Sequence, residues 1–123
     1  MRVSARVLVV EDDEDLRRLY RTSLTFAGFE VQEAGDGFTA LHLIEQRPPD
    51  VVVLDLVLPR LNGHAVQQEI AARVHTRHIP IVIVTGSDEN AHAAWVLRKP
   101  VAPERLVQAV RSCLASGAPT AGT

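Results

Sequence analysis

Apolar residues follow two kinds of pattern along this chain. Residues 6–10, 51–58, 79–84 and 95–97 are short, nearly continuous apolar runs, whereas residues 29–33 alternate apolar with polar positions. Continuous runs of this length are typical of strands buried on both faces of a parallel sheet, and alternation is typical of a half-exposed strand. The pattern therefore predicts five strands, with 29–33 at an edge of the sheet.

Segments with helical periodicity separate these runs. Asp13 or Asp15, Asp36-Gly37, Asn62-Gly63 and Pro103 precede or open the four segments. The expected apolar faces comprise Leu16, Leu19, Tyr20 and Leu24, then Ala40, Leu41 and Ile44, then Ala65, Val66, Ile70 and Val74, and finally Leu106, Val107, Val110 and Leu114. Alternating strands and helices predict a doubly wound α/β fold, because each return to a parallel strand crosses one face of the sheet in a right-handed sense.

Asp55 is an ionisable residue inside the apolar run 51–58. Because burying a lone carboxylate is unfavourable, we expect Asp55 at the carboxyl end of its strand, where open α/β sheets bind their ligands. The other continuous runs end in Glu11-Asp12, Thr85 and Lys99. The carboxyl ends of parallel strands meet at one edge of the sheet, so these polar side chains are expected to lie together.

Composition narrows the class of protein. A length of 123 residues with 46% hydrophobic content suits one domain, expected at 1–115, and residues 116–123 are typical of a flexible tail or linker. A net charge of −2 without a basic block argues against direct binding to nucleic acid or a membrane surface. No apolar run has the length of a signal peptide or membrane span. The single cysteine, Cys113, excludes an internal disulfide and fits a reducing compartment, so we expect a cytoplasmic location.

The residues at the strand ends permit a particular chemistry. Three carboxylates at one edge repel each other unless a cation lies among them. Mg²⁺ prefers oxygen ligands, typically one or two carboxylates, waters and a phosphate oxygen. Lys99 adds an ammonium group, and Thr85 adds a hydroxyl that can donate to an anionic oxygen. Because carboxylates can act as nucleophiles that form aspartyl phosphate, the set indicates a phosphoryl site.

Four motifs occur in an order that resembles the receiver domain of two-component response regulators. They are Val-Leu-Val-Val-Glu-Asp-Asp at 7–13, Leu-Asp-Leu-Val-Leu-Pro-Arg-Leu-Asn-Gly at 54–63, Val-Thr-Gly at 84–86 and Lys-Pro at 99–100. The resemblance implies a flavodoxin-like receiver fold, with a five-stranded parallel sheet in the order 2-1-3-4-5. It also implies a signalling domain that switches partner binding when it is phosphorylated.

The resemblance implies roles for four residues near the middle of the site. Asp55 corresponds to the phosphoacceptor and Asp12 to a direct Mg²⁺ ligand. Glu11 corresponds to the neighbouring acid that acts through water, and the carbonyl of Val57 would be a further metal ligand. The implied cofactor is Mg²⁺, and the implied partner is a sensor histidine kinase or a phosphotransfer protein. The implied reactions are only Mg²⁺-dependent self-phosphorylation from a donor and self-dephosphorylation, so we do not expect an enzyme that turns over other substrates.

The resemblance also covers the last two strand ends. Thr85 corresponds to the switch hydroxyl that moves towards the phosphoryl group, and Lys99 to the lysine that pairs with that group. The Lys99-Pro100 bond resembles the cis peptide bond of the family, an isomer accessible in practice only before proline.

The chain departs from the family pattern between Thr85 and Lys99, which are only 14 positions apart. The missing residues fall where the fourth crossover helix belongs, so we expect that helix to be shortened or missing. The eight residues 87–94 reach about 26–29 Å when extended but only about 12 Å as a helix, which predicts at most one helical turn and a mostly extended return. An extended return leaves apolar surface near Trp95 exposed, which predicts a homodimer or another partner on that face.

The chain also departs from the family at the aromatic switch position, which is occupied by Val96. Trp95 is offset from that position by one residue, so its side chain is expected to point to the other face of the sheet.

Other functions compete with the signalling switch. The short segment before Trp95 favours a phosphorylation-independent protein–protein interaction module with a receiver fold. A phosphohydrolase with an aspartyl nucleophile fits less well, because such enzymes carry the nucleophile after the first strand and Asp55 follows the third. His75 and His78 have the spacing of metal ligands, but they have no acid or cysteine partner nearby in sequence and are interpreted as surface histidines.

Overall fold

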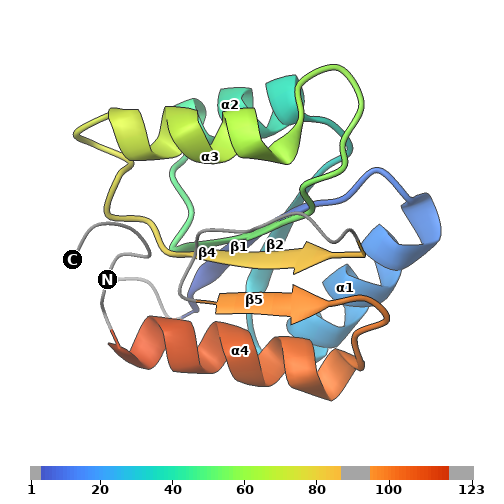
Figure 1. Cartoon of the computed structure of the whole chain (residues 1–123). Coiled ribbons are helices and arrows are strands. Elements are labelled where there is room, and N and C mark those ends of the chain that lie inside the picture. The colour runs from blue at the N-terminus through green and yellow to red at the C-terminus, as the bar shows by residue number, and fades with distance from the viewer. Residues whose placement is uncertain (1–3, 87–94, 117–123) are drawn as a thin grey trace.

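The computed structural model describes residues 4–86 and 95–116. The elements in chain order are β1 (Arg6–Val10), α1 (Glu14–Phe26), β2 (Glu30–Ala34), α2 (Gly37–Gln46), β3 (Val51–Leu54), α3 (Gly63–Ala72), β4 (Ile81–Thr85), β5 (Trp95–Arg98) and α4 (Pro103–Ser116). All neighbouring strands pair in parallel, in the order β2-β1-β3-β4-β5, which confirms the expected topology. Helices α2 and α3 cover one face of the sheet, and α1 and α4 cover the other (Figure 1).

The burial of each strand follows from its place in this order. Strands β3 and β4 are buried at every position, and β1 is buried at all positions after Arg6. Strand β2 pairs only with β1, and it exposes Glu30 and Glu33 while burying Ala34. A strand with neighbours on both sides and helices on both faces needs apolar side chains in both directions, whereas an edge strand does not. The prediction of an edge position for the alternating strand is therefore confirmed.

The sheet separates two apolar cores. Side chains along a strand point alternately to opposite faces. Val7 and Val9 of β1 pack in the core under α1 and α4, whereas Leu8 and Val10 pack in the core under α2 and α3. Both cores contain residues from β1, β3 and β4, so these three strands are held from both sides. This anchoring fixes the positions of the strand ends that carry the site.

Polar side chains begin three of the helices. Each accepts a hydrogen bond from a backbone amide of the first turn, where the helix itself supplies no acceptor. The pairs are Asp13 with the amide of Leu16 at 3.0 Å, Asp36 with that of Thr39 at 2.8 Å, and Asn62 with that of Ala65 at 3.0 Å. Of the two candidates for the first cap, the structure thus selects Asp13.

Two residues expected on apolar helix faces are exposed. Val74 lies beyond the end of α3, because the backbone becomes extended at Arg73, and its exposed fraction is 75%. Leu19 lies within α1 but is 42% exposed, so the buried stripe of that helix is narrower than the apolar pattern indicates. The prediction that these two residues face the core was wrong. The apolar pattern does not show where a helix ends or how wide a stripe of it packs against the sheet.

Element boundaries differ slightly from the expected ones. Strand β4 begins at Ile81, after Pro80, which has no N–H for the sheet ladder, and it includes Thr85. Helix α4 continues through Ser116, one residue past the expected end of the domain at 115. The expected short fourth helix and extended return concern residues 87–94, which lie outside the described residues, as does 117–123. The homodimer through Trp95 stays a prediction.

In the described part of the chain, no helix has both the length and the apolar character needed to span a membrane.

Candidate functional site

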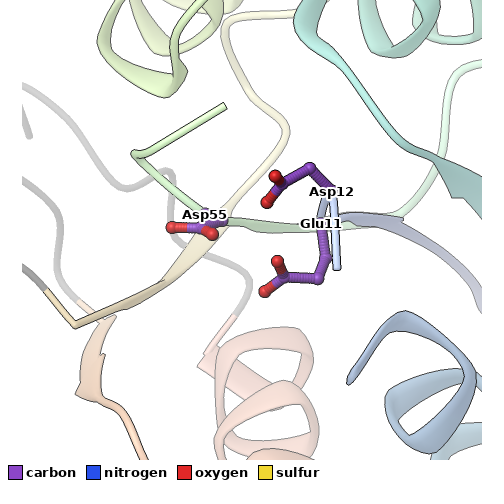
Figure 2. A group of neighbouring side chains, drawn as sticks. All are labelled: Glu11, Asp12 and Asp55. Atoms are coloured by element: carbon purple, nitrogen blue, oxygen red, sulfur yellow. The ribbon is translucent and has the colours of Figure 1, made fainter. Parts of the chain in front are cut away.

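Three acids and a lysine occupy the carboxyl edge of the sheet. Glu11 and Asp12 directly follow β1, Asp55 directly follows β3, and Lys99 directly follows β5. One carboxylate oxygen from each acid lies within 4.8 Å of the other two. Figure 2 shows the side chains of Glu11 and Asp12 leaving the end of β1 on the side that faces Asp55. The structure therefore brings together the acids that the sequence places at separate strand ends.

Lys99 joins two of these acids. Its Nζ donates to Oε1 of Glu11 at 2.7 Å and to Oδ2 of Asp55 at 3.0 Å. The two acceptor side chains are only 2% and 5% exposed, whereas the lysine side chain is 22% exposed. Two carboxylates can be buried side by side here because the ammonium lies between them. In this charged group the two carboxylates are buried, and the lysine side chain is partly exposed to water.

The pKa values of this group reflect both burial and pairing. Burial of the Glu11 carboxyl raises its pKa and outweighs the hydrogen bonds from Lys99 and from the amide of Asp13. Burial acts to lower the pKa of Lys99, but its hydrogen bonds to Glu11 and Asp55 leave that pKa raised. The lysine is therefore charged throughout the neutral range and available to pair with an anion.

The second oxygen of Asp55 is also bound by the protein. Oδ1 accepts a hydrogen bond at 3.1 Å from the amide of Val57, two residues along the loop. The backbone amide of Asp55 donates to the carbonyl of Val10 at 3.0 Å, which fixes the residue against the end of β1. The carboxylate is therefore held in one orientation at the carboxyl edge of the sheet.

Asp12 differs from its two neighbours. It is exposed, and its carboxylate makes no hydrogen bond or ion pair among residues 4–86 and 95–116. Both of its oxygens are therefore available to a ligand. Carboxylate oxygens together with water are the donor set that Mg²⁺ prefers, so the residues present fit this ion.

Comparison with known proteins identifies the family. The sequence matches the response regulator receiver domain over residues 7–111. The chain belongs to this family. Among curated relatives, response regulator MprA of Mycobacterium sp. (strain KMS) is 38% identical over 125 residues, covering 95% of this chain and 54% of the relative. The receiver domain thus spans about half the length of the curated relatives it matches.

Solved structures agree with this assignment. A response regulator receiver domain protein from Clostridium thermocellum superposes with a TM-score of 0.80 at 27% identity, covering 91% of this chain and 95% of that one. A sensor protein from Polaromonas sp. JS666 superposes with a TM-score of 0.83 at 27% identity, covering 93% of this chain and 98% of that one. The resemblance read from the four sequence motifs is confirmed.

The remaining expected site residues of the receiver domain lie on β4 and β5. Thr85 is fully buried as the last residue of β4, and its carbonyl accepts a hydrogen bond from the amide of Lys99 at 2.9 Å. Val96 packs in the core under α2 and α3, whereas Trp95 packs in the core under α1 and α4. The two side chains therefore point to opposite faces, as the one-residue offset predicts. The bond before Pro100 is cis.

Gly63 is a site residue whose role the sequence analysis missed. A Cβ at this position would lie 2.3 Å from the carbonyl oxygen of Asp55 and 2.5 Å from the Cα of Leu56, closer than real atoms approach. The Gly63 amide donates to the carbonyl of Leu56 at 3.0 Å. Glycine thus lets α3 begin directly against the backbone of the central aspartate. The Asn-Gly pair was noted as a turn signal, but its close contact is visible only in three dimensions.

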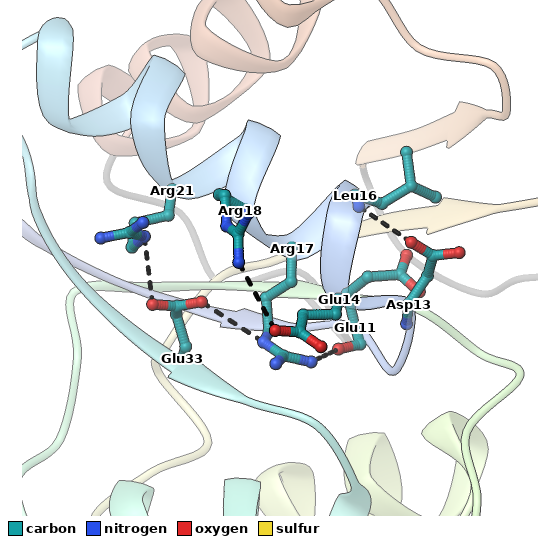
Figure 3. A network of polar contacts seen from close by, with 8 residues as sticks. All are labelled: Glu11, Asp13, Glu14, Leu16, Arg17, Arg18, Arg21 and Glu33. Carbon is teal, nitrogen blue, oxygen red and sulfur yellow. Dashed lines mark hydrogen bonds and ion pairs between the residues drawn. The ribbon is translucent and has the colours of Figure 1, made fainter.

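Arg17 is a second residue that the sequence did not single out. It lies on α1, and its Nη1 donates to the carbonyl oxygen of Glu11 at 2.8 Å (Figure 3). In the sequence it is one of three arginines on a polar helix face and has no distinguishing signal. Only the packing of α1 beside the end of β1 distinguishes it from Arg18, whose nearest partner is Glu14 on the same helix.

Proposed function

We propose that this receiver domain is a signalling switch that accepts a phosphoryl group on Asp55 and thereby changes its affinity for an output partner. The donor would be a sensor histidine kinase or a phosphotransfer protein, which implies a cytoplasmic location. The observation that carries the proposal is the contact of the Asp55 carboxylate with the Lys99 ammonium at 3.0 Å, beside two further acids. A nucleophile, a cation and metal-binding oxygens together suit phosphoryl transfer.

The positions of these groups support a particular transfer step. A carboxylate oxygen of Asp55 attacks phosphorus, so that a P–O bond forms, the P–N bond of the donor phosphohistidine breaks, and the donor imidazole takes up a proton. Lys99 offsets the charge of the phosphoryl oxygens, for which it is already positioned at the acceptor. Asp12, Asp55 and the Val57 carbonyl would hold Mg²⁺, with Glu11 acting through water, and the bound ion would supply further positive charge.

The switch itself would begin at Thr85. Its position at the buried end of β4, with its carbonyl bonded to the amide of Lys99, supports a role in sensing the new phosphoryl group. Val96 stands where the family has an aromatic residue, and it packs against the core under α2 and α3. A movement of Thr85 would therefore reach that core through a smaller side chain than in the rest of the family. We therefore propose the family's phosphoacceptor chemistry with a modified readout.

The decisive experiment is the intact mass after incubation with phosphoramidate or acetyl phosphate and Mg²⁺. We expect one added phosphoryl group in the parent, and none with EDTA or in Asp55→Asn. Asp12→Asn should need a much higher Mg²⁺ concentration for the same labelling, because a direct ligand is lost. Asp36→Asn is the matched control, since it makes the same chemical change at a helix cap outside the group of three acids and should be labelled like the parent.

Two outcomes would contradict the proposal. Labelling of Asp55→Asn at the parental level would show that another residue is the acceptor. A parent that takes no phosphoryl group from either donor or from a histidine kinase would favour the alternative, an interaction module that works without phosphorylation. The 14-position spacing between Thr85 and Lys99 is the observation that favours this alternative.

A further inference from the structure

Arg17 connects three elements next to the acidic site without belonging to it. Besides the bond to the Glu11 carbonyl at 2.8 Å, its Nε donates to Oε1 of Glu33 on β2 at 3.3 Å. Oε2 of Glu33 in turn forms an ion pair with Nε of Arg21, 3.2 Å away. Figure 3 shows the Arg17 side chain extending from α1 to a position between the end of β1 and Glu33. The guanidinium thus joins α1, β1 and β2 where β1 turns into the acidic loop.

The space for this guanidinium is provided by Gly35. A Cβ at that position would approach Nη1 of Arg17 to 3.3 Å, which is tighter than ordinary contact. The side chain of Arg17 is only 21% exposed, so much of it lies against the protein. A planar guanidinium can donate in two directions at once from a fixed position, which the point charge of a lysine cannot do.

The Glu11 carbonyl is the group through which Arg17 can affect the site. This carbonyl belongs to the planar peptide that joins Glu11 to Asp12, so its direction sets the plane of that peptide. The amide of Glu11 donates to the carbonyl of Ala34 at 3.0 Å, and Oε2 of Glu11 accepts from the amide of Asp13 at 3.1 Å. With Arg17 on the carbonyl, every polar group of Glu11 has a partner.

Asp12 is the residue that most needs this support. Its own side chain makes no hydrogen bond or ion pair within the described ranges, so nothing but the backbone directs it towards Glu11 and Asp55. If the peptide before it rotated, the Asp12 carboxylate would leave the group of three acids. The bond from Arg17 to the Glu11 carbonyl opposes that rotation.

We propose that Arg17 is a positioning residue for the acid pair: by fixing the peptide between Glu11 and Asp12, it sets the affinity of the site for a divalent cation. The inference rests on the proposed Mg²⁺ site and deepens it, since Arg17 touches neither the cation nor the phosphoryl group. Residues that orient metal ligands typically contribute 10–100-fold to metal affinity. Because Arg17 acts through the backbone, the effect is expected at the lower end, about tenfold.

A purely electrostatic role makes the opposite prediction. Arg17 is a cation next to three carboxylates, and it repels Mg²⁺. If charge alone mattered, Arg17→Gln would bind Mg²⁺ more tightly than the parent, and Arg17→Lys would bind it equally well. Positioning predicts weaker binding in both variants. The sign of the change in Arg17→Gln therefore separates the two roles.

The experiment measures the Mg²⁺ dissociation constant by titration calorimetry for the parent, Arg17→Gln and Arg17→Lys. Both variants should bind Mg²⁺ about tenfold more weakly than the parent. Arg21→Gln is the matched control, because it removes a neighbouring cation of the same network without touching Arg17 or the Glu11 carbonyl, and it should bind like the parent. If Arg17→Gln does not fold, Arg17→Lys decides, since equal affinity in that variant would overturn the proposal.

A second measurement needs no metal. Amide hydrogen exchange in EDTA at Asp13, whose amide donates to Oε2 of Glu11, should be faster in Arg17→Gln than in the parent, and unchanged in Arg21→Gln. Unchanged exchange at this amide would overturn the positioning role even if Mg²⁺ affinity fell. A parent that binds no Mg²⁺ would refute the proposed metal site, whereas the exchange data would still decide whether Arg17 holds this peptide.

Discussion

Two glutamates of this receiver domain are both hydrogen-bonded to cationic side chains, yet their pKa values move in opposite directions. Glu45 on α2 accepts from Nε2 of His75 at 3.1 Å and also pairs with Arg73, and these bonds lower its pKa. Glu11 accepts from Lys99 at 2.7 Å, but burial of its carboxyl raises its pKa. The Glu45 side chain is 38% exposed and that of Glu11 is 2% exposed.

The effect of an ion pair on a carboxylate depends on how far the pair is exposed to water. On the surface, water solvates both charges, and the pair adds little. At the edge of the sheet, taking the carboxylate out of water is so unfavourable that even a short bond to an ammonium does not fully compensate. Burial at this site therefore disfavours the charged form of Glu11 more than its partners favour it. Such a site is suited to receive a cation or to change when its charge changes.

The largest expected effect comes from removing the cation of the buried group. Lys99→Met leaves Glu11 and Asp55 buried without their cation, each keeping only its hydrogen bond from a backbone amide, and we expect the free energy of unfolding to fall by about 3 kcal/mol at pH 7. This is the lower end of the usual range for breaking a buried pair, because Lys99 is partly exposed. Urea denaturation in EDTA measures the change. Adding Glu11→Gln to Lys99→Met should recover part of the loss, and a Lys99→Met protein as stable as the parent would refute the comparison.

A pH series should separate the two glutamates by the sign of their effect. A raised pKa means that the folded state holds the Glu11 proton more tightly, so its contribution to stability is full below pH 4.5 and is lost as pH rises through the raised pKa. The lowered pKa of Glu45 gives the reverse: its contribution is present above pH 4.5 and is lost as pH falls through the lowered pKa.

The measurement compares Glu11→Gln and Glu45→Gln with the parent by urea denaturation in EDTA from about pH 3 to pH 8. As pH rises above 4.5, the free energy of unfolding of the parent should fall relative to that of Glu11→Gln. The amount by which the parent is more stable than Glu45→Gln should shrink as pH falls below 4.5. Parallel curves for the two variants would mean that burial does not distinguish the two sites.

The smallest effect is expected at the surface cluster itself. Arg73 pairs with Glu45 and, through Nη2, with Oε1 of Glu69 at 2.9 Å, and its side chain is 37% exposed. Arg73→Met makes the same kind of change as Lys99→Met, the loss of one cation from two carboxylates, but water replaces the lost contacts. We expect the melting temperature to change by less than about 2 °C and the change to vanish at high salt. A loss as large as that of Lys99→Met would show that exposure is not what sets the two clusters apart.

Part of the site could be predicted from the sequence because its members stand at ends of apolar runs. Asp55 was expected at the carboxyl end of its strand, and β3 ends one residue before it, at Leu54. Asp36 and Asn62 precede helical patterns and do begin α2 and α3. These features are local: strand burial, periodicity and caps depend on residues a few positions apart. The five-stranded order also followed, through the resemblance that four short motifs carry.

Contacts between residues that are distant in sequence depend on how the elements pack. Lys99 meets Asp55 and Glu11 across separations of 44 and 88 residues, so the bonds exist only when strands β1, β3 and β5 end at matching heights. Arg17 reaches the Glu11 carbonyl because α1 packs beside β1, and nothing in its sequence neighbourhood distinguishes it from Arg18. The ends of the apolar runs in the sequence indicate which residues stand at the edge of the sheet. Packing and register decided which atoms touch there, because those contacts join elements that local patterns cannot place relative to one another.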